Sequence, residues 1–110
     1  MIKRILALDG VVVIAHFRDD GELVEAYGLL GDDQNERLVR FAHDYKRIVQ
    51  GHQDQLSMFT QLRGWTPPRG WIVRGRTMSV CSVSNMVALV ENGEGNLTEV
   101  MTELTDLASY

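Results

Sequence analysis

Side chains that could hold a metal ion or share acid–base chemistry gather near the start of the chain, in the stretch DGVVVIAHFRDDGELVEAYG. His16, Asp19, Asp20 and Glu22 lie close together there, and Gly21 could serve as the glycine of a calcium loop. The calcium-loop spacing fails, because aligning Gly21 with the loop glycine places His16 where a ligand carboxylate belongs. The same residues also fit two strands joined by a hairpin turn.

Turn chemistry favours the hairpin. A two-residue turn at Asp20-Gly21 would place Asp19 opposite Glu22, and like charges that face each other across two strands destabilise a sheet. A three-residue loop, Asp19-Asp20-Gly21, puts glycine at a left-handed position and sets Arg18 opposite Glu22, which is an attractive pair. We therefore interpret these acids as turn residues and not as a metal site.

The histidines and the single cysteine form no other pattern for metal binding or nucleophilic catalysis. His43 and His52 do not have the three- or four-residue spacing that would let them share an ion on one helix, and His52 is interpreted as a core or interface histidine. Cys81 lies in an apolar strand and is expected to be a buried structural thiol. A phosphate-binding GxxxxGK[ST] loop is missing from the sequence. We assign no catalytic residue, metal or cofactor.

Arginines interleaved with tryptophans form the most distinctive cluster of the chain. Cations beside stacking aromatic rings can bind single-stranded nucleic acid or an anionic ligand. Arginine and tryptophan are also enriched at protein interfaces, and charges on an edge strand deter aggregation. We favour the protein interface and keep the other two interpretations as alternatives. The cluster comprises Arg63, Arg69, Arg74, Arg76, Trp65 and Trp71.

A long amphipathic helix is predicted over residues 34–63. Asp33 and Glu36 fit a capping box at its start, and Gly64 suits its end. Unbroken, this helix would span about 45 Å, against a radius of gyration of about 13 Å for a domain of this size. It therefore either kinks near Gly51 or packs against another chain. Its apolar stripe comprises Leu38, Phe41, Tyr45, Ile48, Val49, His52, Leu56, Phe59 and Leu62.

The remaining sequence predicts strands on both sides of this helix. A short helix over residues 2–8 and strands at 11–17 and 22–28 come first. After the connector WTPPRG, three strands are predicted in WIVRGRTM, SVCSVSN and MVALVEN, and Asn96 can cap a last helix. Adjacent strands with flanking helices predict an α+β fold built on an antiparallel sheet. The stripe of the last helix comprises Leu97, Val100, Met101, Leu104, Leu107 and Ala108.

Composition narrows the function classes. At 110 residues the chain is expected to be a single domain over residues 1–110. Its net charge of −4 gives no general reason to bind nucleic acid or an anionic membrane, and no apolar run reaches the ~18 residues of a membrane span. A single cysteine suits a reducing cytosol, so we expect a cytoplasmic protein.

The chain resembles the roadblock/dynein light-chain family. The segment LALDGVVVIAHFRDDGELVEAYG carries the resemblance, and WTPPRGW, SVCSVSN and VALVEN are similar to an uncharacterised prokaryotic branch of that family. The resemblance implies a roadblock-like (profilin-like) sandwich. Its five-stranded antiparallel sheet would have the long middle helix on one face and the terminal helices on the other. This chain departs from better-known members by its longer middle helix.

The same resemblance implies a homodimer formed through the middle helix and the third strand. Family members are non-catalytic scaffolds or regulators, often of small GTPases or of multi-subunit complexes. The resemblance to the prokaryotic branch suggests an accessory subunit in sulfur oxidation. We therefore expect a non-enzymatic module that binds itself and an unidentified protein. A small-ligand or nucleotide sensor is the alternative. The candidate interface residues are Trp65, Trp71, Val73, Arg74, Arg76, Tyr45, His52 and Leu56.

Overall fold

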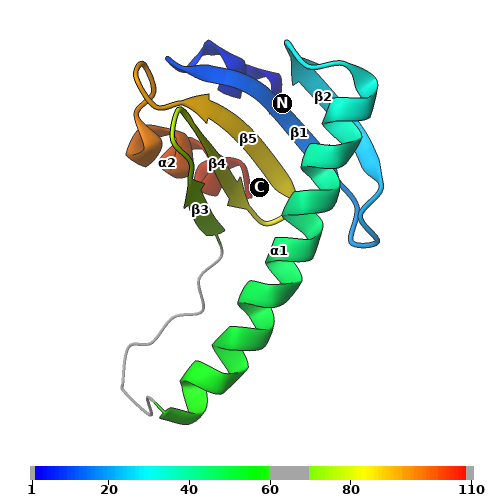
Figure 1. The fold of residues 1–110 in the computed structure, drawn as a ribbon, viewed down its shortest axis with the longest axis vertical. Coiled ribbons are helices and arrows are strands. Elements are labelled where there is room, and N and C mark those ends of the chain that lie inside the picture. Colours follow the sequence, from blue (N-terminus) through cyan, green and yellow to red (C-terminus); the bar gives the residue numbers. More distant parts are fainter. Residues whose placement is uncertain (1, 60–69, 109–110) are drawn as a thin grey trace.

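The computed structural model describes residues 2–59 and 70–108, and between residues 49 and 59 it describes the backbone alone. A short helix comes first in the chain and a second one comes last. Between them lie the five strands of one sheet, with a long helix inserted between the second and third strands (Figure 1). The elements are η1 (Ile2–Ala7), β1 (Val11–Phe17), β2 (Leu23–Gly28), α1 (Asp32–Phe59), β3 (Gly70–Arg74), β4 (Met78–Val83), β5 (Met86–Glu91) and α2 (Leu97–Ala108).

The sheet has five strands in the order β2-β1-β5-β4-β3, and every neighbouring pair is antiparallel. β2 and β3 are therefore its two edges. α1 crosses one face, while η1 and α2 cover the other (Figure 1). The predicted α+β sandwich is confirmed, with the long middle helix and the terminal helices on opposite faces.

The first hairpin has the predicted three-residue loop. The Arg18 amide donates to the Glu22 carbonyl and the Gly21 amide donates to the Arg18 carbonyl, both at 2.8 Å. Gly21 has a φ of 91°, which an L side chain rarely adopts. The Arg18 guanidinium lies 3.7 Å from the Glu22 carboxylate, and the Asp20 carboxylate accepts the Glu22 amide at 2.9 Å. The acids in this loop stabilise a turn.

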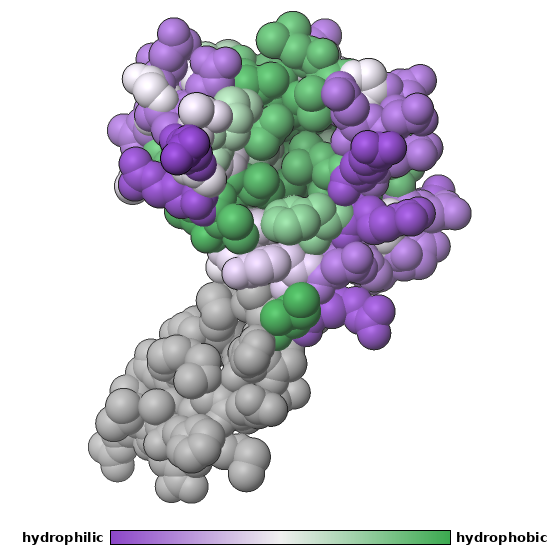
Figure 2. Space-filling model, viewed as in Figure 1, coloured by the Kyte–Doolittle hydropathy of each residue, from purple (hydrophilic) through white to green (hydrophobic). Residues whose placement is uncertain are grey.

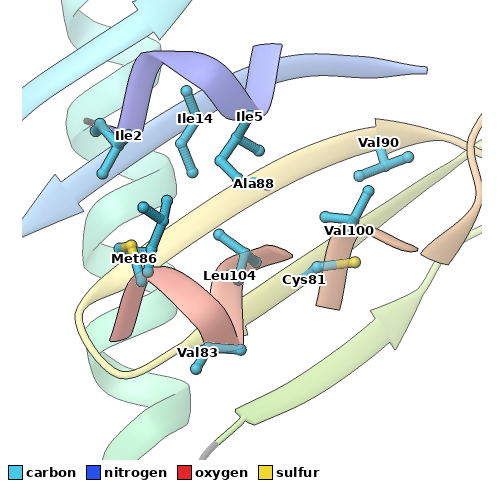
Figure 3. Packing of buried hydrophobic residues seen from close by; sticks show 11 residues of the cluster. Ile2, Ile5, Ile14, Cys81, Val83, Met86, Ala88, Val90, Val100 and Leu104 are labelled. Carbon is cyan, nitrogen blue, oxygen red and sulfur yellow. The ribbon is translucent and has the colours of Figure 1, made fainter. Parts of the chain in front are cut away.

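The larger part of the core lies between the sheet and the pair η1 and α2 (Figure 3). The predicted cap of α2 is confirmed, because the Asn96 side chain accepts the Glu99 amide at 3.1 Å. The predicted α2 stripe is also confirmed, with Val100, Leu104 and Leu107 buried. The predicted short helix at the start of the chain forms as the 3-10 helix η1, whose Ile2 and Ile5 enter this core.

α1 begins earlier than the sequence predicted. It starts at Asp32, and the Gly31 amide donates to the Gln34 side chain at 3.3 Å. The predicted capping box of Asp33 and Glu36 is therefore wrong, because both residues already lie within the first two turns. The helix continues without a break through Gly51, so of the two alternatives left open by the sequence, a kink near Gly51 and packing against another chain, the kink is not observed.

The face that α1 buries also differs from the predicted stripe. Asn35, Val39 and Ala42 are the buried positions, whereas Phe41 is 42% exposed and Ile48 is 54% exposed. The described part of the predicted stripe, from Leu38 to Ile48, thus lies along the border of the buried face. Val39 and Ala42 pack into the smaller core against the sheet, whereas the larger Phe41 and Ile48 stay partly exposed.

β3 is shorter than predicted. It ends at Arg74, and the Gly75 amide donates to the Met78 carbonyl at 2.8 Å to turn the chain into β4. Arg76 therefore lies in the turn and not on the strand, which corrects the expectation that the strand continues through WIVRGRTM. The connector at residues 64–69, with Trp65 and Arg69, lies outside the described residues, as do Leu62 and Arg63.

Candidate interaction surface

Three aromatic rings join α1 to the edge strand β3. The Tyr45 and Trp71 ring centroids lie 4.5 Å apart, and Phe41 lies 5.8 Å from Tyr45 and 6.1 Å from Trp71. Phe41 and Tyr45 meet because they are four residues apart on one side of α1. Trp71 reaches them from the sheet, where it also packs against the smaller core under α1. The structure thus brings together two of the predicted interface residues, Tyr45 and Trp71.

The sheet face beside this cluster is apolar and incompletely covered. Strand register places Val73 of β3 opposite Val80 of β4, and Val80 opposite Leu89 of β5. These three side chains form a row on the same face as Trp71, and each stays partly exposed. α1 lies mainly over β1, β2 and β5, so this row extends past the helix.

We call this region the α1–β3 surface, and Figure 2 shows the hydrophobic side chains that gather over the sheet beside α1. α1 adds the half-exposed Ile48 to it before continuing beyond the sheet to Phe59 (Figure 1). A contiguous group of exposed and partly exposed apolar side chains is typical of an interaction site. The surface comprises Phe41, Tyr45, Ile48, Trp71, Val73, Val80 and Leu89.

The other predicted interface residues divide into four groups, the first of which is Arg76, exposed in the turn after β3. Val73 lies on the α1–β3 surface, while Arg74 is exposed and lines a depression with the start of α2, on the opposite face. His52 and Leu56 lie on the described backbone of α1, but their side chains, like all of Trp65, lie outside the description. Sequence reasoning missed Val80 and Leu89, because strands that are apolar on both faces do not reveal which face is left uncovered.

A polar junction holds α1 on the sheet just before the helix leaves it. The Lys46 ammonium donates to the Asn85 side-chain oxygen at 2.7 Å, and the Asn85 amide donates to the Asp19 carboxylate at 2.7 Å. The His43 ring is 2.9 Å from the Asp19 carbonyl and packs edge-on against Phe17. One loop, one turn and one helix therefore meet at these side chains.

The one cysteine of the chain is a free thiol within the core. Cys81 is fully buried, and burial raises the pKa of its thiol to about 11, so it stays protonated at neutral pH. In residues 2–59 and 70–108, no group of three or more described His, Cys, Asp or Glu side chains is arranged to hold a metal ion. Among the same residues, no helix is both long and apolar enough to cross a bilayer.

Comparisons with known proteins agree with this architecture. A family model described as "Uncharacterized conserved protein (DUF2173)" matches residues 1–106. The fold is similar to that of a Roadblock/LC7 domain from Streptomyces avermitilis, with a TM-score of 0.80 at 10% sequence identity, covering 98% of this chain and 88% of that chain. Myxococcus xanthus MglB has a TM-score of 0.51 at 16% identity, covering 90% of this chain and 84% of that chain. No curated protein sequence matches the chain. The roadblock-like fold inferred from the sequence is confirmed.

Proposed function

The chain belongs to the family described as "Uncharacterized conserved protein (DUF2173)", and we propose that it is a non-catalytic homodimeric module that holds or regulates a partner protein. The α1–β3 surface is the observation that carries this proposal. Its rings and half-exposed aliphatic side chains are the residue types that dominate binding energy at protein interfaces.

A second copy of this chain is the occupant that fits the surface best. β3 is an edge strand, and an unpaired edge presents backbone N–H and C=O groups that favour pairing with another strand. A two-fold axis beside β3 would let the strand meet itself antiparallel and continue the sheet across both chains. The same axis would carry each overhanging α1 toward the uncovered sheet face of the other copy.

The length of α1 supports the same arrangement. Its 28 residues span about 42 Å, and the sheet of one copy supports only the first half of the helix. An amphipathic helix gains most of its stability from packing its apolar face, so the second half needs a cover. The partner copy supplies that cover without any further protein.

The dimer would then act as a platform for another protein in the cytoplasm, with residues 1–110 as one roadblock-like domain. Roadblock-like domains are generally regulatory or scaffold domains, which is the basis for proposing a role without catalysis. A small GTPase, or a subunit of a metabolic complex such as one of sulfur oxidation, is the class of partner that the family resemblance suggests.

Light scattering on wild type and two point variants tests the homodimer. At micromolar concentration the wild type should have the mass of two 12.4 kDa chains. Ile48→Glu should weaken association by roughly 30-fold or more, because it places a charge at a half-exposed position that the dimer buries.

The matched control is Val24→Glu. Val24 is 47% exposed, similar to Ile48, but it lies on β2 at the other edge of the sheet. The control should leave the dimer intact. A wild type with the mass of one chain, or equal weakening by both variants, would contradict the proposal.

A sensor for a small ligand or nucleotide remains the second candidate, and the depressions on the described surface bear on it. Four of these depressions have volumes of about 340 to 350 Å³, near the lower end of the range for ligand pockets. This size favours a single side chain or a small molecule over a nucleotide. Thermal stabilisation by a metabolite or nucleotide would favour the sensor, and its absence across a broad panel would favour the scaffold.

A further inference from the structure

A depression on the face opposite the α1–β3 surface combines a carboxylate with apolar walls. Strand register places Glu25 of β2 opposite His16 of β1, and His16 opposite Met86 of β5, so the three side chains form one row across the sheet. Ile2 of η1 and Leu107 of α2 line the same depression, whose volume is about 340 Å³.

The Glu25 carboxylate lines this depression, and the described residues that line it with Glu25 include no lysine or arginine. Glu25 is half-buried, and in the described part of the chain it forms no ion pair. Its carboxylate accepts only one described hydrogen bond, from the Tyr27 hydroxyl at 3.0 Å, which leaves oxygen lone pairs free. The ammonium of Lys3 lies instead over the Tyr27 ring, 5.7 Å from its centroid.

The C-terminal end of α2 adds to the negative electrostatic potential of this depression. Leu107 and Ala108 form the last described turn of that helix and line the depression, and the last turn contains no basic residue. The C-terminal end of a helix carries a partial negative charge that stabilises nearby cations. The Glu25 carboxylate and the C-terminal end of α2 therefore both favour a positively charged ligand. Apolar walls for an aliphatic stem are provided by Ile2, Met86 and Leu107.

We propose that this depression binds an alkylammonium or guanidinium group on an aliphatic stem, as presented by a lysine or arginine side chain of a partner protein. The cation lies against the Glu25 carboxylate and the methylenes lie along the apolar walls. The site does not depend on the proposed dimer, because the α1–β3 surface is on the other face of the sheet. It gives the molecule a second contact for a basic segment of a partner.

The test is an NMR titration of the intact chain with n-butylammonium, using 1-butanol as the neutral probe of similar shape. n-Butylammonium should shift the amide signals of His16, Glu25 and Met86 in a saturable manner, and added salt should weaken the effect. 1-Butanol should bind at least roughly tenfold more weakly, because it lacks the charge-assisted hydrogen bond. Equal binding of both probes, or no saturable shift with n-butylammonium, would overturn the proposal.

Two variants locate the site. Glu25→Gln should weaken n-butylammonium roughly tenfold or more, and the fold should survive because the glutamine oxygen can still accept the Tyr27 hydroxyl. Glu22→Gln removes the same charge from the exposed hairpin loop and should leave the titration unchanged. Unchanged binding in Glu25→Gln would overturn the assignment.

A comparison of free lysine with a blocked lysine then distinguishes a free amino acid from a protein side chain as the source of the cation. Nα-acetyl-lysine N-methylamide, which mimics a side chain within a protein, should bind at least as tightly as free lysine. Markedly tighter binding of free lysine would overturn the assignment to a protein side chain.

Discussion

At the scale of single residues, the loop acids show how turn chemistry can resemble a metal site. Arg18 and Glu22 make their predicted contact, and the Asp20 carboxylate is engaged with a backbone amide of the same loop. Asp19 accepts hydrogen bonds at its side chain and at its carbonyl from residues far along the chain. The local contacts were predictable from charge and spacing. The distant ones were not, because they depend on where α1 and the β4–β5 turn lie in the fold.

Cys81 gives the prediction that belongs to this scale. Its raised pKa of about 11 and its complete burial should make the folded thiol unreactive toward Ellman's reagent (DTNB) at neutral pH. Relative to an ordinary thiol with a pKa of 9.0, the thiolate population falls roughly 100-fold. Labelling should therefore require denaturant, and the protein in urea serves as the control. Rapid labelling of the folded protein would contradict the structure.

The raised pKa of Cys81 also makes the free energy of unfolding depend on pH. A thiol whose pKa is higher in the folded state favours folding below the unfolded pKa, and that contribution is lost as the pH rises. Between about pH 9 and 11 the unfolded chain would lose a proton that the folded chain keeps. Unfolding measurements in this window should therefore show a fall in stability that is smaller in Cys81→Ala.

At the scale of elements, α1 shows what a hydrophobic pattern can and cannot reveal. Periodicity predicted a long helix correctly, and its length alone indicated that it would extend past the sheet. The same pattern did not identify the buried face, because Asn35 and Ala42 occupy it while Phe41 and Ile48 stay partly exposed. When a helix has a buried face beside an exposed apolar face, its sequence shows one broad stripe of apolar residues. The sequence alone does not indicate which part of that stripe is buried.

The polar junction should anchor this helix. Lys46→Met keeps the aliphatic stem but removes the ammonium that donates to Asn85, so we expect a loss of about 1 kcal/mol in the free energy of unfolding. Urea denaturation measures this loss. Arg47→Met removes a neighbouring exposed charge and should change stability by less than about 0.5 kcal/mol. Equal effects in the two variants would show that the Lys46 contact contributes nothing specific.

At the scale of the whole molecule, the two faces of the sheet have different roles. The face under η1 and α2 holds the larger part of the core, and the depression lined by Glu25 lies on it. The face under α1 is only partly covered, and its covering helix extends past the sheet. The order of strands and helices predicted an antiparallel sheet with flanking helices, and the resemblance to the roadblock family implied the roadblock-like sandwich. The partly exposed row of Val73, Val80 and Leu89 was not predictable, because it depends on the angle at which α1 crosses the sheet.

An isotope-filtered NOE experiment on a mixture of labelled and unlabelled chains tests the central claim most directly, because it detects only contacts between copies. The account predicts intermolecular NOEs from the rings of Tyr45 and Trp71 and from the side chains of Ile48 and Val73. It predicts none from Val24 on the opposite edge. Intermolecular NOEs confined to other surfaces, or none at millimolar concentration, would contradict the proposal that two copies associate through the α1–β3 surface.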